Sequence, residues 1–369
     1  MVTRLAAAQA ALGHEVHVAS YEYPATADRI AAYWKTVPHH ELVRSHPITS
    51  NGRIERFAAR GAAGELRRLI PSMNIVHLHG VWDPILKVAA GIAQKARVPY
   101  VVAPHGMLDP WSMRQRRTKK QLALLLGYRR MLDRAAFLHV LNRDEKELLE
   151  PRDLHDRRQV IPNGIFLEEL APMPAKDAFH RERRELVGNP YVLFLSRLHY
   201  KKGLDFLADA LAICASSNSD LQLVVAGPDD GARSDFQQRI DRAGLTNRTH
   251  IVGPLYGPQK LAALRGACCF CLPSRQEGFS MAIAEALACE IPVVISKDCH
   301  FPEVAEVKAG FVVNLDPQEI ARAILQIVNN PHLANEMGRA GRQLIETRFT
   351  WPRVAQQSIE AYQRAIGSK

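Results

Sequence analysis

The segment PSRQEGFSMAIAEALA, residues 273–288, follows a short apolar run and leads into a helical pattern. Gly278 permits a tight turn, and Ser280 is a residue type that often caps the start of a helix. Exposed backbone N–H groups at such a turn, together with the helix dipole, favour an anion. Glu277 lies in the turn and Glu285 within the helix, so the two carboxylates are placed to bind hydroxyls near the anion and further along a ligand. Taken alone, the same spacing also fits two surface salt bridges.

A second strand-to-helix turn, FLSRLHYKKGLDFL at residues 194–207, changes this balance. It places the cations Arg197 and Lys202 just after a strand, and a pyrophosphate is bound well by two such cations. The alternative is a solvent-facing loop, because Lys-Lys-Gly is a common sequence. Two turns of this kind in one half of the chain, one cationic and one with free N–H groups, predict a diphosphate site.

Short apolar runs alternate with helical patterns along the whole chain, which is typical of parallel α/β architecture. Helices are expected at Pro84–Ala96 and Lys119–Asp133, and Leu204, Leu207, Leu211 and Cys214 form one apolar helix face. The predicted strands are 15–19, 75–79, 100–103, 137–140, 159–161, 191–195, 221–226, 250–252, 268–272, 292–295 and 310–313.

The length of 369 residues suggests two domains. The charged, proline-containing stretch Leu167–Pro190 is interpreted as a linker, which gives domains at 1–170 and 171–350. Two open α/β sheets joined in this way bind ligands at the carboxyl ends of their strands. The chain begins inside a helical pattern, Met1–Leu12, so we expect the first domain to lack its opening strand and turn, unless the start is set too late.

Composition narrows the possibilities further. No apolar run approaches the ~20 residues of a membrane span, and no signal-peptide pattern precedes His14. The six cysteines lie in apolar contexts without metal-ligand spacing, which favours buried reduced thiols. These features predict an intracellular protein. Few aromatic residues and no recognition module argue against nucleic acid as a partner.

Positive charge is concentrated in the first half of the chain. Residues 1–150 hold 22 Lys and Arg against 13 Asp and Glu, whereas residues 151–369 hold 26 against 25. Much of the excess lies in the stretch 114–134, on both sides of the apolar run Leu122–Leu126. Such a helix can bind an anionic membrane surface or lie near a phosphorylated ligand. An ordinary solvent-exposed helix face remains the alternative.

The ordered set of motifs resembles the GT-B glycosyltransferases of family 4, also called group 1. The motifs are Glu277-x7-Glu285, Ser196-Arg-Leu with Lys202-Gly203, Ala226-Gly227-Pro228, Ile161-Pro-Asn163-Gly164, Gly253-Pro254 and Pro292-Val-Val. The stretches around His77–Asp83 and Pro104–Ser112 resemble acceptor-side loops of members that build bacterial surface polysaccharides. Glu290 departs from the pattern, since many relatives have glycine there. The resemblance implies two Rossmann-like, doubly wound parallel-sheet domains facing across a cleft, with helix 351–369 packing back on the first domain.

The resemblance also implies roles for individual residues. Arg197 and Lys202 would hold the diphosphate, Glu277 the donor sugar and Glu285 the ribose, while His105 would lie beside the donor sugar. Further donor contacts would come from Gly278, Phe279, Ser280, Gly227, Gly253 and Leu255, and the acceptor side would include His79, Trp82 and Met107.

The implied activity is retaining transfer from a UDP- or GDP-linked sugar to a saccharide or lipid-linked saccharide in surface or exopolysaccharide synthesis. No carboxylate pair suited to a covalent intermediate can be argued from the sequence, so we expect front-face substitution. The resemblance implies that neither metal nor cofactor is needed. The expected location is the cytoplasm, peripheral at the inner membrane face. Two alternatives remain: a nucleotide-sugar epimerase or phosphorylase of similar architecture, or an inert nucleotide-sugar-binding protein because of the missing first strand.

Overall fold

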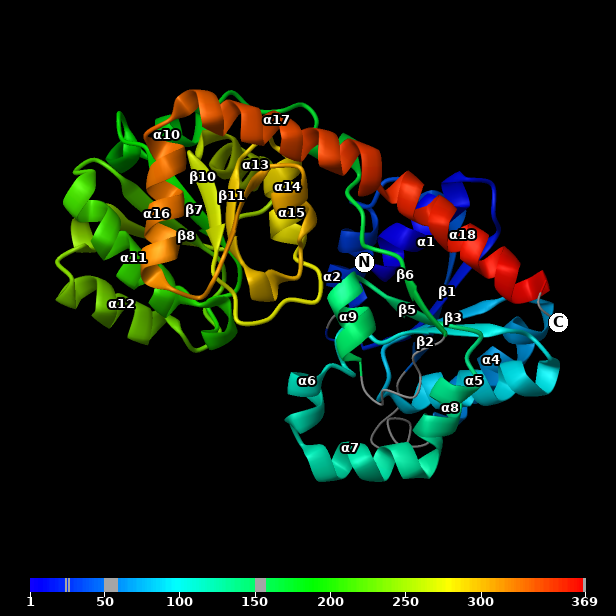
Figure 1. The fold of residues 1–369 in the computed structure, drawn as a ribbon. Helices are drawn as coiled ribbons and strands as arrows, with labels where there is room; N and C mark the ends of the chain where they lie inside the picture. Colours follow the sequence, from blue (N-terminus) through cyan, green and yellow to red (C-terminus); the bar gives the residue numbers. More distant parts are fainter. Residues whose placement is uncertain (24, 26, 50–58, 150–156, 368–369) are drawn as a thin grey trace. The chain divides into compact units, whose positions relative to one another are not determined.

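The computed structural model describes residues 1–23, 25, 27–49, 59–149 and 157–367. The chain forms two compact units, shown in Figure 1: unit 1 comprises Met1–Gly164 with Trp351–Lys369, and unit 2 comprises Ile165–Thr350. Every paired strand in the described residues runs parallel to its neighbour. The α/β class expected from the alternating pattern is therefore confirmed.

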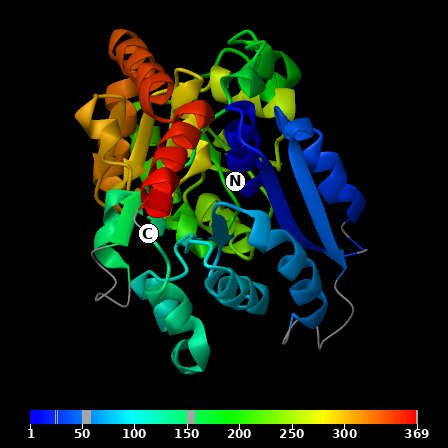
Figure 2. The same cartoon turned by 90° about the vertical axis from the view of Figure 1, so that its right-hand side faces the viewer.

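Unit 1 contains two separate parallel sheets (Figure 2). One pairs β1 (Val16–Glu22) with β2 (Val43–Thr49), and the other has the order β3-β4-β5-β6. The strands of the second sheet are β3 (Val76–His79), β4 (Tyr100–Ala103), β5 (Leu138–Val140) and β6 (Arg158–Val160). In the described part of unit 1, no ladder joins β1 to β3, and α1 (Val2–Ala11) precedes β1, as the sequence pattern indicated.

The helices of unit 1 cover these sheets and include the end of the chain. They are α2 (Ala27–Trp34), α4 (Arg60–Leu69), α5 (Pro84–Ala96), α6 (Pro110–Arg114), α7 (Arg117–Ala123), α8 (Arg129–Asp133), α9 (Arg143–Leu148) and α18 (Trp351–Gly367). Helix α18 packs on α1, where Gln9 Nε2 donates a hydrogen bond to Ser358 Oγ at 2.8 Å. The last helix is thus part of unit 1.

The single helix expected at Lys119–Asp133 is wrong. The helix α7 continues into a π-helical turn, Leu124–Tyr128, and breaks at Gly127, whose φ is +103°. Glycine adopts this left-handed conformation without the steric cost of a side chain. The break turns Tyr128 into the core and leaves Leu125 at the surface, 85% exposed.

Unit 2 is built on one six-stranded sheet of order β12-β11-β10-β7-β8-β9. Its strands are β7 (Tyr191–Leu195), β8 (Gln222–Ala226), β9 (Thr249–Gly253), β10 (Cys269–Leu272), β11 (Val293–Ser296) and β12 (Gly310–Val313). Its helices are α10 (Ala178–Glu182), α11 (Leu204–Ser217), α12 (Arg233–Arg242), α13 (Gly257–Gly266), α14 (Met281–Ala288), α15 (Glu303–Glu306), α16 (Pro317–Val328) and α17 (Pro331–Arg348).

The central strands of unit 2 are buried on both faces, which explains their continuous apolar sequences. The predicted apolar face of α11 lies in this core, including Leu207 and Cys214. All six cysteines are unpaired, and five of them are buried, with Cys268 partly exposed. The expectation of buried free thiols is confirmed for these five.

The stretch interpreted as a linker belongs to unit 2. Phe179 and Leu186 from this stretch are buried in the unit 2 core, and the units divide between Gly164 and Ile165 rather than after residue 170. Phe179 lies in α10 and Leu186 in the 3-10 turn Arg184–Leu186. A single apolar pair seven positions apart among charged residues is too weak a pattern to reveal burial.

Candidate functional site

Two loops leave neighbouring strands at the carboxyl edge of the unit 2 sheet. The β7 loop, residues 196–203, connects β7 to α11, and the β10 loop, residues 273–280, connects β10 to α14. Strands β7 and β10 are paired directly, with Cys269 opposite Val192. The two turns that the sequence predicted to form a diphosphate site therefore lie side by side.

The two loops approach each other so closely that only glycine fits at the contact. Gly203 has a φ of +70°, and a Cβ added there would lie 1.8 Å from the carbonyl oxygen of Pro273. The backbone N–H of Arg275 donates to the carbonyl of Lys201 at 2.7 Å. The Lys-Lys-Gly sequence is thus no ordinary surface loop, because its glycine sets the distance between the two loops.

Arg275 fixes the same junction through its side chain. Its guanidinium binds both carboxylate oxygens of Asp205, at 2.9 and 2.7 Å, and lies 4.0 Å from the ring centroid of Tyr200. Bidentate pairing and stacking are geometries that lysine cannot reproduce. Arg275 and Asp205 lie in the two turns that the sequence analysis singled out, but their pairing was missed because they are 70 positions apart and neither turn indicates its partner.

Carboxylates contact both predicted cations of the β7 loop. Lys202 Nζ lies 2.6 Å from Glu277 Oε1, with side chains only 14% and 9% exposed, so these two predicted site residues are in contact. Arg197 pairs with Asp230 at 2.5 Å, on a much more exposed surface. An exposed pair of this kind contributes little to stability, which leaves Arg197 available for a ligand.

The remaining predicted donor residues lie on the same edge or beside it. A Cβ at Gly227 would lie 1.8 Å from the carbonyl oxygen of Ser196, so the β8 loop also touches the β7 loop. Gly253 ends β9 with a φ of +76°, and Leu255 after it is buried. Glu285 Oε1 accepts a hydrogen bond from Lys260 Nζ on α13, at 2.9 Å.

The start of α14 differs in detail from the prediction. Ser280 occupies the N-cap position and Gly278 lies in the turn before it, but the Ser280 hydroxyl makes no capping hydrogen bond. The Phe279 ring packs against Phe301 and Phe349, so this residue can offer only its backbone to a ligand. Glu290, after the same helix, has a φ of +62°, the conformation for which glycine is the usual residue.

The site residues predicted in unit 1 gather after β3 and β4. His79 Nδ1 and His105 Nε2 are hydrogen-bonded at 3.0 Å. Trp82 stacks at an angle on Tyr128, and Met107 lies against Gly80, within 4 Å of the position of a Cβ there. His105, like Gly106 after it, has a positive φ, so this turn is tightly constrained.

A buried carboxylate that the sequence analysis did not identify holds this turn. Glu145 Oε1 accepts the N–H of Gly106 at 2.8 Å, and Oε2 accepts the N–H of Leu141 at 2.6 Å. Glu145 itself is capped by Asn142, whose Oδ1 accepts its N–H. The signal was present in the Asn-x-x-Glu spacing of a capping box, but the link to Gly106 depends on the tertiary fold.

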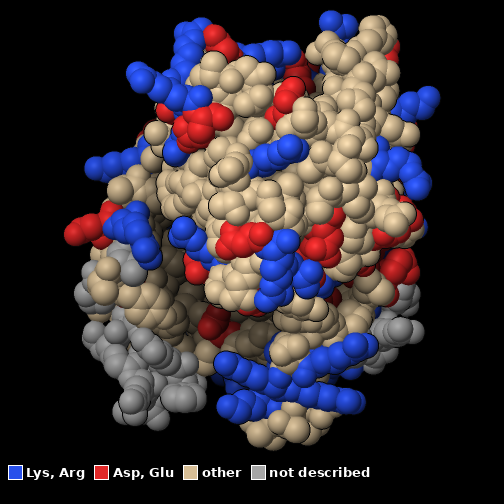
Figure 3. All heavy atoms as spheres, turned by 90° about the vertical axis from the view of Figure 1, so that its left-hand side faces the viewer, with Lys and Arg blue, Asp and Glu red and all other residues tan. Residues whose placement is uncertain are grey.

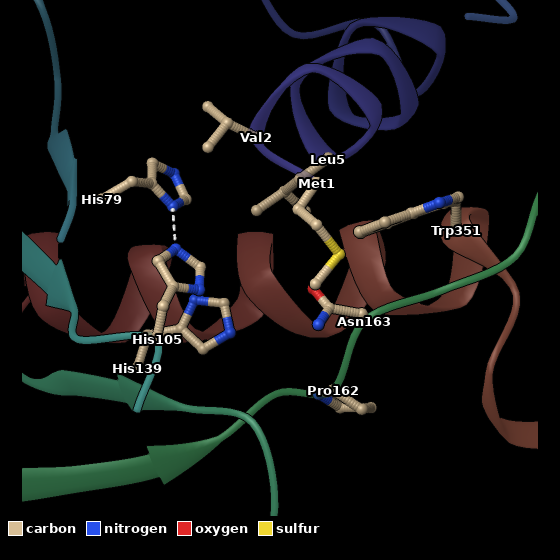
Figure 4. A pocket seen from close by; sticks show the side chains of 9 residues that line it. All are labelled: Met1, Val2, Leu5, His79, His105, His139, Pro162, Asn163 and Trp351. Atoms are coloured by element: carbon tan, nitrogen blue, oxygen red, sulfur yellow. Dashed lines mark hydrogen bonds between the residues drawn. The ribbon is translucent and has the colours of Figure 1, made fainter. Parts of the chain in front are cut away.

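His79 and His105 also line a small cavity of about 10 Å³ in unit 1, shown in Figure 4. His139 and Asn163 contribute to its wall, and Asn163 Nδ2 is buried without a hydrogen-bond partner. Burial lowers the pKa of the His105 imidazole to about 4 and that of His79 well below its usual value. Both rings are therefore uncharged near neutral pH.

Among the described residues, no group of three or more His, Cys, Asp or Glu side chains is arranged to hold a metal ion. No helix among these residues combines the length and the apolar character needed to cross a bilayer.

Comparison with known proteins agrees with this geometry. Residues 175–344 match the model of the glycosyl transferases group 1, and residues 1–164 match that of the glycosyl transferase 4-like domain. Together they cover nearly all of both units. The chain belongs to the family 4, or group 1, glycosyltransferases, which transfer a sugar from a nucleotide sugar.

Individual relatives place the protein within this family. The chain is 26% identical over 345 residues to phosphatidyl-myo-inositol mannosyltransferase of Mycobacterium leprae. The aligned residues cover 88% of this chain and 83% of the relative. It is 28% identical over 314 residues to alpha-maltose-1-phosphate synthase of Mycobacterium tuberculosis, covering 79% of each.

Solved structures show the same fold. Anabaena HepE in complex with UDP superposes with a TM-score of 0.78 at 20% identity, covering 98% of this chain and 96% of that one. Sucrose-phosphate synthase of Thermosynechococcus elongatus superposes with a TM-score of 0.75 at 20% identity, covering 100% and 93%. The fold is GT-B, as expected.

Proposed function

We propose that this protein is a retaining, metal-independent glycosyltransferase that takes a UDP- or GDP-linked sugar and glycosylates a saccharide or lipid-linked saccharide acceptor. The carrying observation is the junction of the β7 and β10 loops, where Gly203 touches Pro273 and Lys202 touches Glu277. A cation, a carboxylate and a helix start converge there, and this combination suits a sugar diphosphate. HepE, a structural neighbour, is crystallised with UDP and glucose, which supports the class of donor.

The proposed chemistry is a front-face substitution. The bond between the anomeric carbon and the diphosphate oxygen breaks, and the acceptor oxygen bonds to the same face of that carbon. The acceptor proton moves to the departing phosphate oxygen. Arg197 and Lys202 stabilise the negative charge that develops on the diphosphate, which is the electrostatic contribution that usually dominates.

The other residues bind rather than react in this proposal. Glu277 is held by Lys202 and would accept a donor-sugar hydroxyl, and Glu285 would bind the ribose. Backbone groups of Gly278, Phe279 and Ser280 would contact the sugar and phosphate. His105 would be the unit 1 residue that contacts the donor sugar, with His79, Trp82 and Met107 on the acceptor side.

Calorimetric titration with UDP, GDP and ADP, in buffer with EDTA, tests the donor site. One nucleotide should bind, and Arg197→Ala should weaken it by roughly tenfold or more, because a charge-assisted contact is worth ~1.5–3 kcal/mol. Arg239→Ala is the matched control, since Arg239 forms a similarly exposed pair with Asp209. Equal losses in the two variants, or binding that requires added magnesium, would contradict the proposal.

The stereochemical course is tested by proton NMR of the product. An α-linked donor and a panel of alkyl glycoside acceptors should give a product with the α configuration. A β-configured product would exclude retention while leaving the donor site intact.

We further propose that α7 and its flanks bind an anionic membrane surface, which would bring the protein to lipid-linked acceptors at the inner face of the cytoplasmic membrane. Leu122 near the end of α7 is 57% exposed, and Leu125 and Leu126 at the break after it are 85% and 63% exposed. Exposed cations lie next to them in the chain: Arg114, Arg116, Arg117, Lys119 and Arg130. Figure 3 shows Lys and Arg gathered at the lower end of the molecule, where Figure 1 places α7.

Co-sedimentation with vesicles tests this surface. A variant with Arg114, Arg116, Arg117 and Lys119 changed to Gln should lose most binding to phosphatidylglycerol vesicles, since each cation contributes ~1 kcal/mol near an anionic surface. Lys120 is left unchanged because its Nζ is bonded to the Ser112 carbonyl at 2.6 Å. The control changes four exposed arginines of unit 2: Arg233, Arg242, Arg322 and Arg339. Equal binding by the two variants would contradict the membrane proposal.

A further inference from the structure

Five rings packed together in unit 1 form a continuous series that reaches the candidate site. Four are the histidine row, defined as His77, His79, His105 and His139, and the fifth is Tyr362 of α18. Tyr362 Oη and His77 Nδ1 are 2.6 Å apart, and His77 Nε2 and His139 Nδ1 are 3.2 Å apart. The series links the last helix of the chain to β3 and β5 of the sheet.

The direction of each hydrogen bond in this series follows from one end. The carbonyl oxygen of Ile161 can only accept, so His139 Nε2, 2.7 Å away, must donate to it. An uncharged His139 then has a lone pair on Nδ1, which accepts the N–H of His77 Nε2. His77 Nδ1 is left as an acceptor, and the Tyr362 hydroxyl must donate to it. Gln9 Nε2 donates to the Tyr362 oxygen at 3.2 Å, which agrees with this direction.

The surroundings keep these rings uncharged. Burial is the main cause that lowers the pKa of His139 to about 4, and it lowers the pKa of His77 well below its usual value. Burial also raises the pKa of the Tyr362 hydroxyl to about 12. The other ionisable groups near the row are the amino group of Met1, which faces His79 and His105, and Glu145, which binds the N–H of Gly106.

The series continues from His77 to His105. The ring centroids of His77 and His79 are 4.0 Å apart, and those of His79 and His105 are 5.3 Å apart with nearly parallel planes. Figure 4 shows His79 and His105 facing each other across their hydrogen bond, with His139 beside His105. A proton added to His77 or His139 would therefore place a positive charge against the His79–His105 pair.

We propose that Tyr362 is a positioning residue that fixes the tautomer of His77 together with the Ile161–His139 contact at the other end of the series, and that it thereby holds the His79–His105 pair uncharged and in place for the donor sugar. The catalytic part of this proposal rests on the proposed function of His105. The tautomer part concerns the protein alone and needs no substrate.

Histidine-selective ¹⁵N NMR of the full chain tests the tautomers. In the wild type, His77 and His139 should both carry their proton on Nε2, and neither should titrate near the ordinary pKa of a histidine. In Tyr362→Phe, the His77 tautomer should become mixed, and the titration midpoint of His105 should rise by at least one pH unit. A wild-type His77 protonated on Nδ1, or a Tyr362→Phe protein with unchanged His77 and His105 signals, would overturn the proposal.

Tyr100→Phe is the matched control. Tyr100 is a buried tyrosine of the same unit that accepts from Gln94 Nε2 and donates to the Met131 carbonyl, so it has the same bonding pattern without a histidine. It should destabilise unit 1 to a similar extent but leave all four histidine signals unchanged. Histidine changes of equal size in this control would show a general loss of packing and overturn the proposal.

The pH profile of donor turnover tests the link to catalysis. The acid limb of kcat should move to higher pH in Tyr362→Phe and stay unchanged in Tyr100→Phe. An unmoved acid limb with an altered His77 tautomer would overturn the role of Tyr362 in positioning His105. Failure of the proposed function would appear separately, as an absence of nucleotide binding in the wild type.

Discussion

Replacing Gly203 with alanine tests whether the β7 and β10 loops touch as described. The left-handed φ of +70° costs an L-residue ~1–2 kcal/mol. In addition, the new Cβ would lie 1.8 Å from the Pro273 carbonyl oxygen, a backbone atom that cannot rotate away, so the loops must separate. Overpacking of this kind adds ~1–3 kcal/mol, which gives a total of about 3 kcal/mol for Gly203→Ala.

Gly244→Ala separates the two contributions. Gly244 has a φ of +68°, almost that of Gly203, but no heavy atom lies within 4 Å of its Cβ position. This variant should lose only the ~1–2 kcal/mol of the left-handed conformation. The difference between the two variants therefore measures the close approach of the loops.

The two units can be observed separately, because all four tryptophans, Trp34, Trp82, Trp111 and Trp351, lie in unit 1. Tryptophan fluorescence follows the unfolding of unit 1, and far-UV circular dichroism follows both units. For a unit of this size, ~1 kcal/mol shifts Tm by about 2–4 °C, so Gly203→Ala should lower the unit 2 transition by roughly 6–12 °C. The tryptophan transition should stay unchanged. Equal shifts for Gly203→Ala and Gly244→Ala would refute the reasoning.

Three further changes have defined outcomes. Arg275→Lys loses the bidentate contact to Asp205 and the stacking on Tyr200. Unit 2 should lose ~1–2 kcal/mol of stability, and the affinity for the nucleotide should also fall. An unchanged unfolding transition by circular dichroism and an unchanged calorimetric titration would argue against this contact. Glu145→Gln replaces one of the two carboxylate oxygens that accept the N–H groups of Gly106 and Leu141 with an NH₂ group, which cannot accept. The variant should destabilise unit 1 by ~1–3 kcal/mol in a urea titration followed by tryptophan fluorescence. An unchanged urea midpoint would contradict these two hydrogen bonds. Burial lowers the pKa values of His105 and His139 to about 4, whereas histidines of the unfolded chain have a pKa of ~6.5. Below pH ~6.5 the unfolded chain therefore binds more protons than the folded chain. The contribution of the two uncharged histidines to the free energy of unfolding is thus complete above that pH and is lost as the pH falls toward 4. The urea midpoint of unit 1 should fall over this window, and a flat profile would show that these histidines are already protonated or exposed.

The sequence predicted the elements whose burial gives them a regular pattern. The central strands of unit 2 are buried on both faces, so their apolar runs are continuous. All six strands of this sheet were found to within one residue at each end. Strand β2 was missed because its sequence VRSHPIT mixes polar residues and a proline with few apolar ones. Its position in a two-stranded sheet demands little burial, so no alternating pattern results.

The candidate site shows the same division between local and tertiary information. Lys202 and Glu277 were singled out from their own turns, and the structure brings them into contact. Arg275 and Asp205 lie in the same two turns, but their pairing joins residues 70 positions apart and has no local signature. The same reason hid Glu145 and Tyr362, whose contacts with the His105 region span 39 and 285 positions.

The assignment of α18 to unit 1 has a consequence for biosynthesis. Gln9 of α1 is translated well before its hydrogen-bond partner Ser358, which lies 349 positions later. At ~5–20 residues per second, the ribosome needs roughly 20–70 s between the two. Unit 2 is one uninterrupted stretch of chain, so its core can form before α18 is made. Until then, the apolar face of α1 that packs against α18 stays uncovered. Helix α18 thus completes a unit whose other helices are made long before it, and removing α18 would leave α1 uncovered.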